Sequence, residues 1–363
     1  MSELASAGQH FMLGLRPTTT LHPLDRALLR DLKPAGIVFF KSNFPHDLPY
    51  ADWLKSHAEL IADIREAVGR ERLFIAIDHE GGRVCRTPPP ITRYAYARHW
   101  GDKAGDVGAA MGAELASLGI NLNFAPSLDI DSNPDNPVIG ARSFARDAAT
   151  VTARGLAFLE RMQKNGVRGC AKHFPGHGDT RTDSHYDLPV IDAPLDELRE
   201  RELAPFKAAI SSGVGMVMTS HILFKAFDAS LPATLSERIV SGLLREEMGF
   251  GGVVVSDDIG MNAISALFND REAAVRFLAA GTDMLTICSY WTDTERARGL
   301  ARAIIDARRS GALDRRALEV SQARVDAMLA QTAQHGVRAL ANSAFAAHAS
   351  AGPLFSSETA EIV

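Results

Sequence analysis

The sequence predicts an α/β protein folded as a single-domain (β/α)₈ TIM barrel, and three observations carry that prediction. Short apolar runs of four to six residues recur eight times along the chain. A stretch with apolar residues at helical spacing separates each run from the next. Polar and charged residues follow directly after at least five of the runs. Because active sites of such barrels lie at the carboxyl ends of the strands, the third observation indicates an enzyme.

The predicted strands are continuous apolar runs, such as GIVFF at 36–40 and GVVV at 252–255. Continuous runs are typical of strands that are buried on both faces of a parallel sheet. Strand–helix alternation alone does not separate a barrel from a doubly wound open sheet, which stays the alternative. The eight expected strands cover residues 11–15, 36–40, 73–77, 120–124, 166–171, 214–218, 252–255 and 283–287.

The predicted helices lie between these runs. Beyond residue 334 the chain becomes rich in alanine and serine and shows no amphipathic stripe. We therefore expect a barrel domain over 1–340 and a loosely packed C-terminal tail over 341–363. Two late helices, 293–309 and 314–330, are expected to close the outer ring. The earlier helices are expected at 23–32, 47–68, 104–118, 148–164, 195–212, 237–247 and 271–280.

Composition excludes several function classes. A net charge of −5 and a pI near 6.2 argue against nucleic acid as a partner, which would require a basic face. Cys85, Cys170 and Cys288 are odd in number and form no CxxC pair, so we expect neither a disulfide framework nor a cysteine zinc site. No basic leader followed by an apolar run opens the sequence, and no run approaches the ~20 residues of a membrane span. We expect a cytoplasmic protein without a membrane partner.

The stretch 171–185 gathers three histidines, a lysine and two acids directly after a strand. Burial in a core would leave these ionisable groups without partners, so a loop that carries chemistry is the better interpretation. Asp183 can orient the imidazole of His185, whose ordinary pKa of about 6.5 suits proton transfer near neutrality. His177 and Asp179 are expected to shape the loop. Although His173, His177, Asp179 and His185 carry atoms that can ligate zinc, no closely spaced ligand pattern is present, and we expect no metal.

A second acidic group follows the run at 252–255, in Ser256, Asp257 and Asp258. A carboxylate at a strand end is held rigidly, as a nucleophile that attacks one carbon from one direction must be. Serine and aspartate in this position are also common helix N-caps. Spacing alone leaves both interpretations open.

Three segments carry a resemblance to a known family. They are KHFPGHGDT at 172–180 with DSH at 183–185, LLREE at 243–247 with GVVVSD at 252–257, and IDHEGGR at 77–83. Together they resemble the family 3 glycoside hydrolases, and more narrowly their bacterial β-N-acetylhexosaminidase branch of cell-wall recycling. The resemblance runs from residue 11 to about residue 330, and it implies a single-domain barrel.

The resemblance also implies roles for individual residues. In the family the acid after the serine or threonine is the nucleophile, which is Asp257 here, and a loop histidine with its aspartate forms the acid/base dyad, here His185 and Asp183. The chain departs from the family pattern at His79, where glutamine is common, and at 134–137, which alters the loop before Arg142. The sugar-binding positions carry over to Asp78, Arg86, Arg142, Lys172 and His173.

The function that the resemblance implies is retaining exo-hydrolysis of terminal β-linked N-acetylglucosamine, from muropeptides derived from peptidoglycan. Asp257 would form a covalent glycosyl-enzyme, and no cofactor is required. The partner is then a small carbohydrate. Three alternatives stay open: a β-glucosidase of the same family, a phosphorylase, and a sugar-binding barrel without catalysis.

Overall fold

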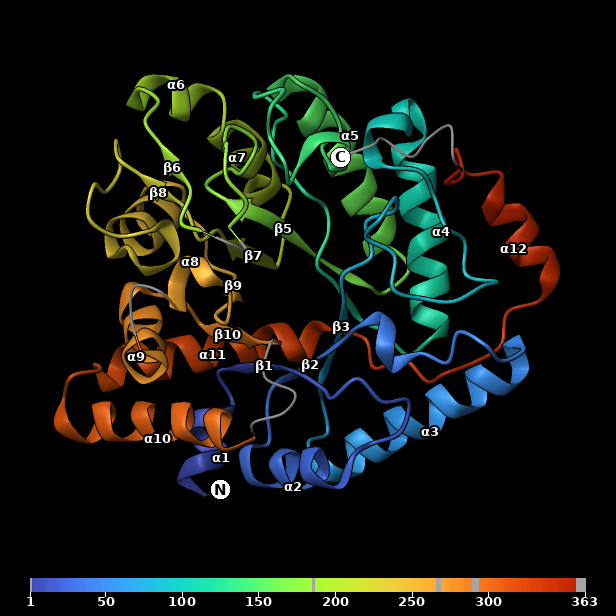
Figure 1. Ribbon diagram of the computed structural model, residues 1–363, viewed down its shortest axis with the longest axis horizontal. Coiled ribbons are helices and arrows are strands. Elements are labelled where there is room, and N and C mark those ends of the chain that lie inside the picture. The colour runs from blue at the N-terminus through green and yellow to red at the C-terminus, as the bar shows by residue number, and fades with distance from the viewer. Residues whose placement is uncertain (1, 185–186, 266–268, 289–293, 357–363) are drawn as a thin grey trace.

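The structure is a computed structural model that describes residues 2–184, 187–265, 269–288 and 294–356. Eight parallel strands close into a barrel in the order β1-β10-β9-β7-β5-β4-β3-β2, with helices around it (Figure 1). Closure excludes the open-sheet alternative and confirms the predicted fold. The strands are β1 (Phe11–Gly14), β2 (Gly36–Phe39), β3 (Phe74–Ile77), β4 (Leu122–Asn123), β5 (Arg168–Phe174), β7 (Met216–Thr219), β9 (Val253–Asp258) and β10 (Met284–Ile287).

Each barrel strand is buried on both faces, which explains the continuous apolar runs. In β2, Ile37 packs outward against the helices, whereas its neighbour Val38 points into the barrel. In β3, Ile75 packs outward and Phe74 inward. Successive side chains of strands such as β2 and β3 alternate between two apolar environments, so these strands show no alternation of apolar and polar residues.

The outer helices follow the predicted ranges closely. In Figure 1, α1, α2 and α10 group along one edge of the molecule, where they contact one another. The helices are α1 (Glu3–Gly8), α2 (Pro23–Leu32), α3 (Tyr50–Val68), α4 (Ala104–Ser117), α5 (Ala148–Gln163), α8 (Asn262–Ser265), α9 (Asp270–Ala280) and α10 (Thr294–Ser310), with the π-helix η6 (Arg238–Glu247). Short 3₁₀ turns are η1 (Lys41–Asn43), η2 (Ala97–His99), η3 (Gly101–Lys103), η4 (Gly140–Arg142) and η5 (Ala233–Leu235).

The single helix expected at 195–212 is wrong, because the structure has two helices there. They are α6 (Leu195–Glu200) and α7 (Leu203–Ser211). Pro205 lacks the N–H that a continuous helix would bond to the carbonyl of Arg201, so the helix breaks before it. A small parallel pair, β6 (Val190–Ile191) and β8 (Leu223–Phe224), also lies outside the barrel and was not expected.

Helix α11 (Arg315–Gln331) does not complete the outer ring, in contrast to the expectation. Its residues Val325, Met328 and Leu329 pack into the barrel interior, in one cluster with the first residues of strands, such as Phe74 and Met216. The helix therefore covers the amino ends of the strands. Its apolar side chains complete the inner core, because the open bottom of the barrel would otherwise expose that core to water.

The segment after residue 340 has more contacts over 341–356 than a loosely packed tail would have. It forms α12 (Asn342–Ala349), which packs on α4 at the outside of the molecule (Figure 1). The ring of Phe345 contacts that of Tyr50 with 5.5 Å between centroids. The Tyr94 hydroxyl donates to the carbonyl of His348 at 2.7 Å. The aromatic side chain of Phe345 anchors a segment whose composition is otherwise uninformative.

Among the described residues, no helix is both long and apolar enough to span a membrane.

Candidate active site

A cavity of about 620 Å³ opens at the carboxyl ends of the barrel strands. It is lined by residues that follow β3, by β5 and the loop after it, and by the end of β9. Because these strands are parallel, their polar ends meet at one edge of the barrel. Of the site residues predicted from the sequence, His185 lies outside the described residues. The others all line this cavity: Asp78, Arg86, Arg142, Lys172, His173, Asp183 and Asp257.

Lys172 is the centre of a buried network of charges. Its Nζ lies 2.7 Å from Asp78 Oδ1 and 2.6 Å from Glu80 Oε1. Burial alone would lower the pKa of Lys172, but the two carboxylates outweigh it and raise that pKa. The ammonium is therefore charged, and the two carboxylates hold it at a fixed position in the wall of the cavity.

Glu80 connects this network to Arg142. The guanidinium of Arg142 donates from Nε and Nη2 to the two Glu80 oxygens, each at 2.9 Å. Burial would raise the pKa of Glu80, but Arg142 and Lys172 hold it well below its usual range. Sequence reasoning did not place Glu80 in the site, although its position after a strand in the IDHEGGR segment was a usable signal.

Asp129 is fully buried and holds both His173 and the loop that follows β5. The ring Nδ1–H of His173 donates to Asp129 Oδ2 at 2.7 Å, and the backbone N–H groups of His173 and His177 donate to Oδ1 at 3.1 and 2.8 Å. The Ser127 hydroxyl donates to Oδ2 at 2.8 Å. With Nδ1 engaged, Nε2 is the ring atom of His173 that can contact a ligand in the cavity.

Two glycines allow the loop after β5 to run close to its neighbours. Gly176 has φ +144°, and a Cβ there would lie 2.5 Å from Glu202 Oε2. A Cβ on Gly178 would lie 1.5 Å from the carbonyl oxygen of Ile130. Only glycine fits either position, so the loop packs onto the barrel and brings Asp183 to the cavity wall.

His177 shapes this loop from inside. Its Nδ1 lies 3.0 Å from Thr180 Oγ1 and its Nε2 lies 3.1 Å from Ser184 Oγ. Burial, reinforced by the charge of His173, lowers the pKa of His177 to about 4. A neutral imidazole that bridges two hydroxyls fits the loop-shaping role expected for it. Asp179 Oδ2 lies 3.0 Å from Arg201 Nη2, and this ion pair connects the loop to the turn between α6 and α7.

Asp257 stands near the end of β9, partly exposed to the cavity. The backbone N–H of Asp258 donates to its Oδ1 at 2.8 Å. Burial would raise the pKa of Asp257, but His173, His221 and Lys172 together hold it below its ordinary value. The carboxylate is therefore ionised at neutral pH, as a nucleophile requires.

Asp258 differs from its neighbour in the partners of its carboxylate. Its Oδ1 accepts from the backbone N–H groups of Gly260 and Cys288, both at 3.1 Å. These bonds stabilise the turn after β9. Both carboxylates line the cavity, and the choice of Asp257 over Asp258 as nucleophile stays a prediction.

Within the described ranges, no group of three or more His, Cys, Asp and Glu side chains is arranged to hold a metal ion. The histidines beside the cavity instead have hydrogen-bonding partners in the protein. His173 contacts a carboxylate, His177 contacts two hydroxyls, and His221 Nε2 donates to the carbonyl of Asp258 at 3.0 Å.

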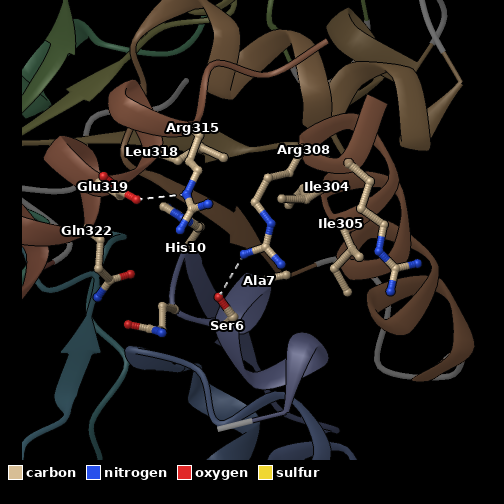
Figure 2. Close-up of a pocket in the computed structure, with 12 residues that line it drawn as sticks. Ser6, Ala7, His10, Ile304, Ile305, Arg308, Arg315, Leu318, Glu319 and Gln322 are labelled. Carbon is tan, nitrogen blue, oxygen red and sulfur yellow. Dashed lines mark hydrogen bonds and ion pairs between the residues drawn. The ribbon is translucent and has the colours of Figure 1, made fainter. Parts of the chain in front are cut away.

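A second cavity of about 600 Å³ lies at the other end of the barrel, between α1, α10 and α11 (Figure 2). Arg308 and Arg315 line it, as does His10, which immediately precedes β1. Arg308 donates to Ser6 Oγ at 3.2 Å, and Arg315 donates to Glu319 at 3.0 Å. Of the predicted site residues that the structure describes, none lines this cavity. The candidate active site is therefore the cavity at the carboxyl ends of the strands.

Replacing Arg142 with lysine is expected to lower the free energy of unfolding by about 1–3 kcal/mol, because one ammonium cannot span both oxygens of Glu80. Urea denaturation followed by circular dichroism measures this change. Arg146→Lys is the matched control, because Arg146 is 68% exposed and its contact with Asp131 is replaceable. It is expected to change stability by less than about 0.5 kcal/mol. Equal effects of the two substitutions would contradict a structural role for the Arg142–Glu80 pair.

The chain is similar to known proteins over most of its length. Residues 18–328 match the family described as glycosyl hydrolase family 3 N terminal domain. The chain is 36% identical over 354 residues to beta-hexosaminidase A of Pseudoalteromonas piscicida, an alignment that covers 90% of this chain and 58% of that protein. It is 35% identical over 277 residues to a beta-hexosaminidase of Neisseria meningitidis serogroup C, covering 73% and 74% of the two chains. This chain thus spans less than two thirds of the Pseudoalteromonas protein.

Solved structures agree with these sequence matches. A family 3 β-N-acetylglucosaminidase from Paenibacillus sp. is similar with a TM-score of 0.86 and 35% identity, over 99% of this chain and 67% of that one. NagZ from Neisseria gonorrhoeae, solved with N-trifluoroacetyl-D-glucosamine, is similar with a TM-score of 0.75 and 29% identity, over 96% and 98% of the two chains. A barrel of the predicted kind, a cavity at its carboxyl ends and a family match over 18–328 lead to one conclusion: the chain belongs to glycosyl hydrolase family 3.

Proposed function

We propose that the protein is a retaining exo-glycosidase that removes terminal β-linked N-acetylglucosamine, or a closely related N-acetylhexosamine, from the non-reducing end of its substrate. The observation that carries the proposal is an ionised carboxylate, Asp257, in a cavity with the buried charges of Lys172 and Arg142. The relatives named beta-hexosaminidase, and a neighbour solved with a glucosamine derivative, support the choice of sugar.

The network around Lys172 is proposed to bind the sugar. Asp78, Lys172 and Arg142 present charged acceptors and donors to hydroxyl groups. The ion pairs of Lys172 with Asp78 and of Arg142 with Glu80 fix them before the sugar arrives. Arg86 and His173 complete the set. Rigid groups of this kind hold the ring in one orientation, which places the anomeric carbon for attack. The cavity volume lies within the range of small-molecule sites, about 300–1,000 Å³.

The proposed reaction has two steps. In the first, Asp257 attacks the anomeric carbon, the bond to the leaving oxygen breaks, and His185 gives that oxygen a proton. In the second, His185 takes a proton from water, and the water oxygen displaces Asp257. Each step inverts the anomeric carbon, so the product keeps the β configuration. The role of His185 rests on the family resemblance and on its neighbour Asp183, which lines the cavity.

The natural substrate is proposed to be a muropeptide released from peptidoglycan, within cell-wall recycling in the cytoplasm. This choice rests on the resemblance to the β-N-acetylhexosaminidase branch of the family. Hydrolysis of defined muropeptides and of chitin fragments, compared by kcat/KM, tests it. A clear preference for chitin fragments would contradict the muropeptide assignment but leave the reaction unchanged.

Covalent trapping tests the mechanism. Incubation with a 5-fluoro N-acetylglucosaminyl fluoride is expected to leave the sugar bound to the peptide that contains Asp257. The ring fluorine slows both steps, but the fluoride leaving group keeps formation of the intermediate faster than its hydrolysis. Mass mapping of a protease digest locates the label. Label on another residue, or an α product seen by NMR at early times, would contradict the proposal.

The same reaction with added phosphate separates hydrolysis from phosphorolysis. We expect free N-acetylglucosamine with and without phosphate. Accumulation of the sugar 1-phosphate would instead identify a phosphorylase.

A panel of nitrophenyl sugars separates the proposed enzyme from a β-glucosidase. The glucoside is expected to react much more slowly than the N-acetylglucosaminide.

A further inference from the structure

A cysteine–histidine pair lies directly behind the wall of the proposed sugar cavity. Cys85 Sγ is 3.8 Å from His79 Nε2, within hydrogen-bond distance for sulfur. Neither side chain lines the cavity, and neither has a part in the proposed reaction. The pair is therefore a feature that hydrolysis does not explain.

The backbone holds both members in place. The N–H of His79 donates to the amide oxygen of Asn123 at 3.0 Å, and its carbonyl accepts from the same amide at 2.8 Å. The chain then turns back, with the N–H of Glu80 donating to the carbonyl of Val84 at 2.8 Å. This turn sets Cys85 against the ring of His79, so the contact is built into the loop after β3.

The ring of His79 has Cys85 as its side-chain partner. It is buried, and within the described part of the chain its Nδ1 has no hydrogen-bond partner. Burial would lower the pKa of His79, but the sulfur of Cys85 opposes this and raises it, with Glu114 adding to the effect and Arg86 opposing it. An imidazolium beside the sulfur stabilises a thiolate, as in reactive cysteines.

Cys85 differs from the other two cysteines in both charge and access. Burial would raise its pKa, but the neighbouring imidazole of His79 and the charge of Arg93 bring it down to about 7. Its side chain is partly exposed, whereas Cys170 and Cys288 are buried and burial raises the pKa of both thiols. The chain thus contains two internal controls for the reactivity of Cys85.

The position of Cys85 couples it to the cavity. The residues on either side of it, Val84 and Arg86, both line the cavity, whereas Cys85 faces His79 behind them. An oxygen added to the sulfur has to fit against the buried ring of His79 or displace this short segment. Displacement would move Arg86, which is expected to bind the sugar.

We propose that Cys85 and His79 form a modification site at which hydroperoxides oxidise Cys85 and thereby weaken binding at the sugar cavity. The thiolate sulfur attacks the terminal oxygen of the hydroperoxide, an S–O bond forms and the O–O bond breaks. The departing oxygen takes the proton of the His79 imidazolium and leaves as water or an alcohol. Sulfur loses two electrons, the hydroperoxide gains them, and Cys85 becomes a sulfenic acid that thiols can reduce.

Labelling of the native protein tests the chemistry without any activity assay. With iodoacetamide at pH 7, Cys85 is expected to react at least roughly tenfold faster than Cys170 or Cys288. Its half-maximal rate is expected near pH 7, and His79→Gln is expected to move that midpoint up by at least one pH unit. With hydrogen peroxide and dimedone, the adduct is expected on Cys85 alone. Equal labelling of the three cysteines, an unshifted midpoint in His79→Gln, or no dimedone adduct would overturn the proposal.

The link to the cavity rests on the proposed function and has its own readout. Peroxide is expected to raise KM for a nitrophenyl N-acetylglucosaminide at least threefold, with recovery after dithiothreitol. Cys85→Ser is expected to keep the starting activity and to resist peroxide. Oxidation of Cys85 with no change in KM would overturn the coupling. An enzyme inactive on this substrate would overturn the proposed function instead, and the labelling result would still stand.

Discussion

Replacing Asp257 with asparagine is expected to reduce kcat by about 10⁴-fold, since an amide of the same shape cannot attack the anomeric carbon. The fold should survive, because the side chain is partly exposed at the end of β9 and its Oδ1 accepts one backbone N–H, which an amide oxygen also accepts. Turnover of a nitrophenyl N-acetylglucosaminide measures kcat, and circular dichroism of the variant shows whether the fold is kept.

Asp258→Asn is the matched control, because the two carboxylates are adjacent on the same strand end. The bonds that Asp258 Oδ1 accepts from Gly260 and Cys288 can be kept by an amide oxygen, so kcat is expected to fall less than about tenfold. In Asp257→Gly, azide is expected to restore turnover and give the α-glycosyl azide. A larger loss of kcat in Asp258→Asn than in Asp257→Asn would contradict the assignment of Asp257 as the nucleophile.

Replacing Asp129 with alanine is expected to lower the free energy of unfolding by about 3–5 kcal/mol, the largest stability effect in the site. Four donors converge on its two oxygens: the ring and backbone N–H of His173, the backbone N–H of His177 and the Ser127 hydroxyl. Alanine leaves these donors buried without a partner. Chemical denaturation measures the loss, and Asp135→Ala, an exposed position on the same segment, is expected to change stability by less than about 0.5 kcal/mol.

The contribution of Asp129 also depends on pH in a defined direction. Burial would raise its pKa, but His173 and the backbone donors outweigh burial and lower it. A carboxylate with a lowered pKa in the folded state stabilises that state at pH values above its ordinary pKa of about 3.9. That stabilisation is lost as the pH falls towards the folded-state value. The difference in stability between wild type and Asp129→Asn is therefore expected to shrink below about pH 4, and an unchanged difference would contradict the depressed pKa.

The fold was predictable because the barrel repeats one simple signal. Strands such as β2, with Ile37 outside and Val38 inside, are buried on both faces, so such strands are continuous apolar runs. The exceptions depend on tertiary contacts. The amphipathic pattern of α11 identifies a helix but does not say which surface it covers, and only the closed barrel has an open bottom for it.

The site was predictable where chemistry is concentrated in sequence and less so where it depends on pairing. Lys172 and Asp257 stand at strand ends in charged segments, and both line the cavity. Glu80 lay unused in one of the same motifs, because its function depends on Lys172 and Arg142, distant in sequence. The role of Asp129 was not predicted, because its four donors come together only when the loop after β5 folds over it.

The placement of α11 determines how a sugar chain would enter the proposed active site. Val38, Phe124 and Met218 belong both to the lining of the cavity and to the inner core, and beneath that core lie Val325 and Met328 of α11. The proposed sugar site is thus closed at its inner end. A pocket that is closed at its inner end admits only the end of a sugar chain. Binding the middle of such a chain would need a groove that is open at both ends. Under the proposed function, single sugar residues would be released one by one, and each freed sugar would leave through the mouth by which the next substrate enters.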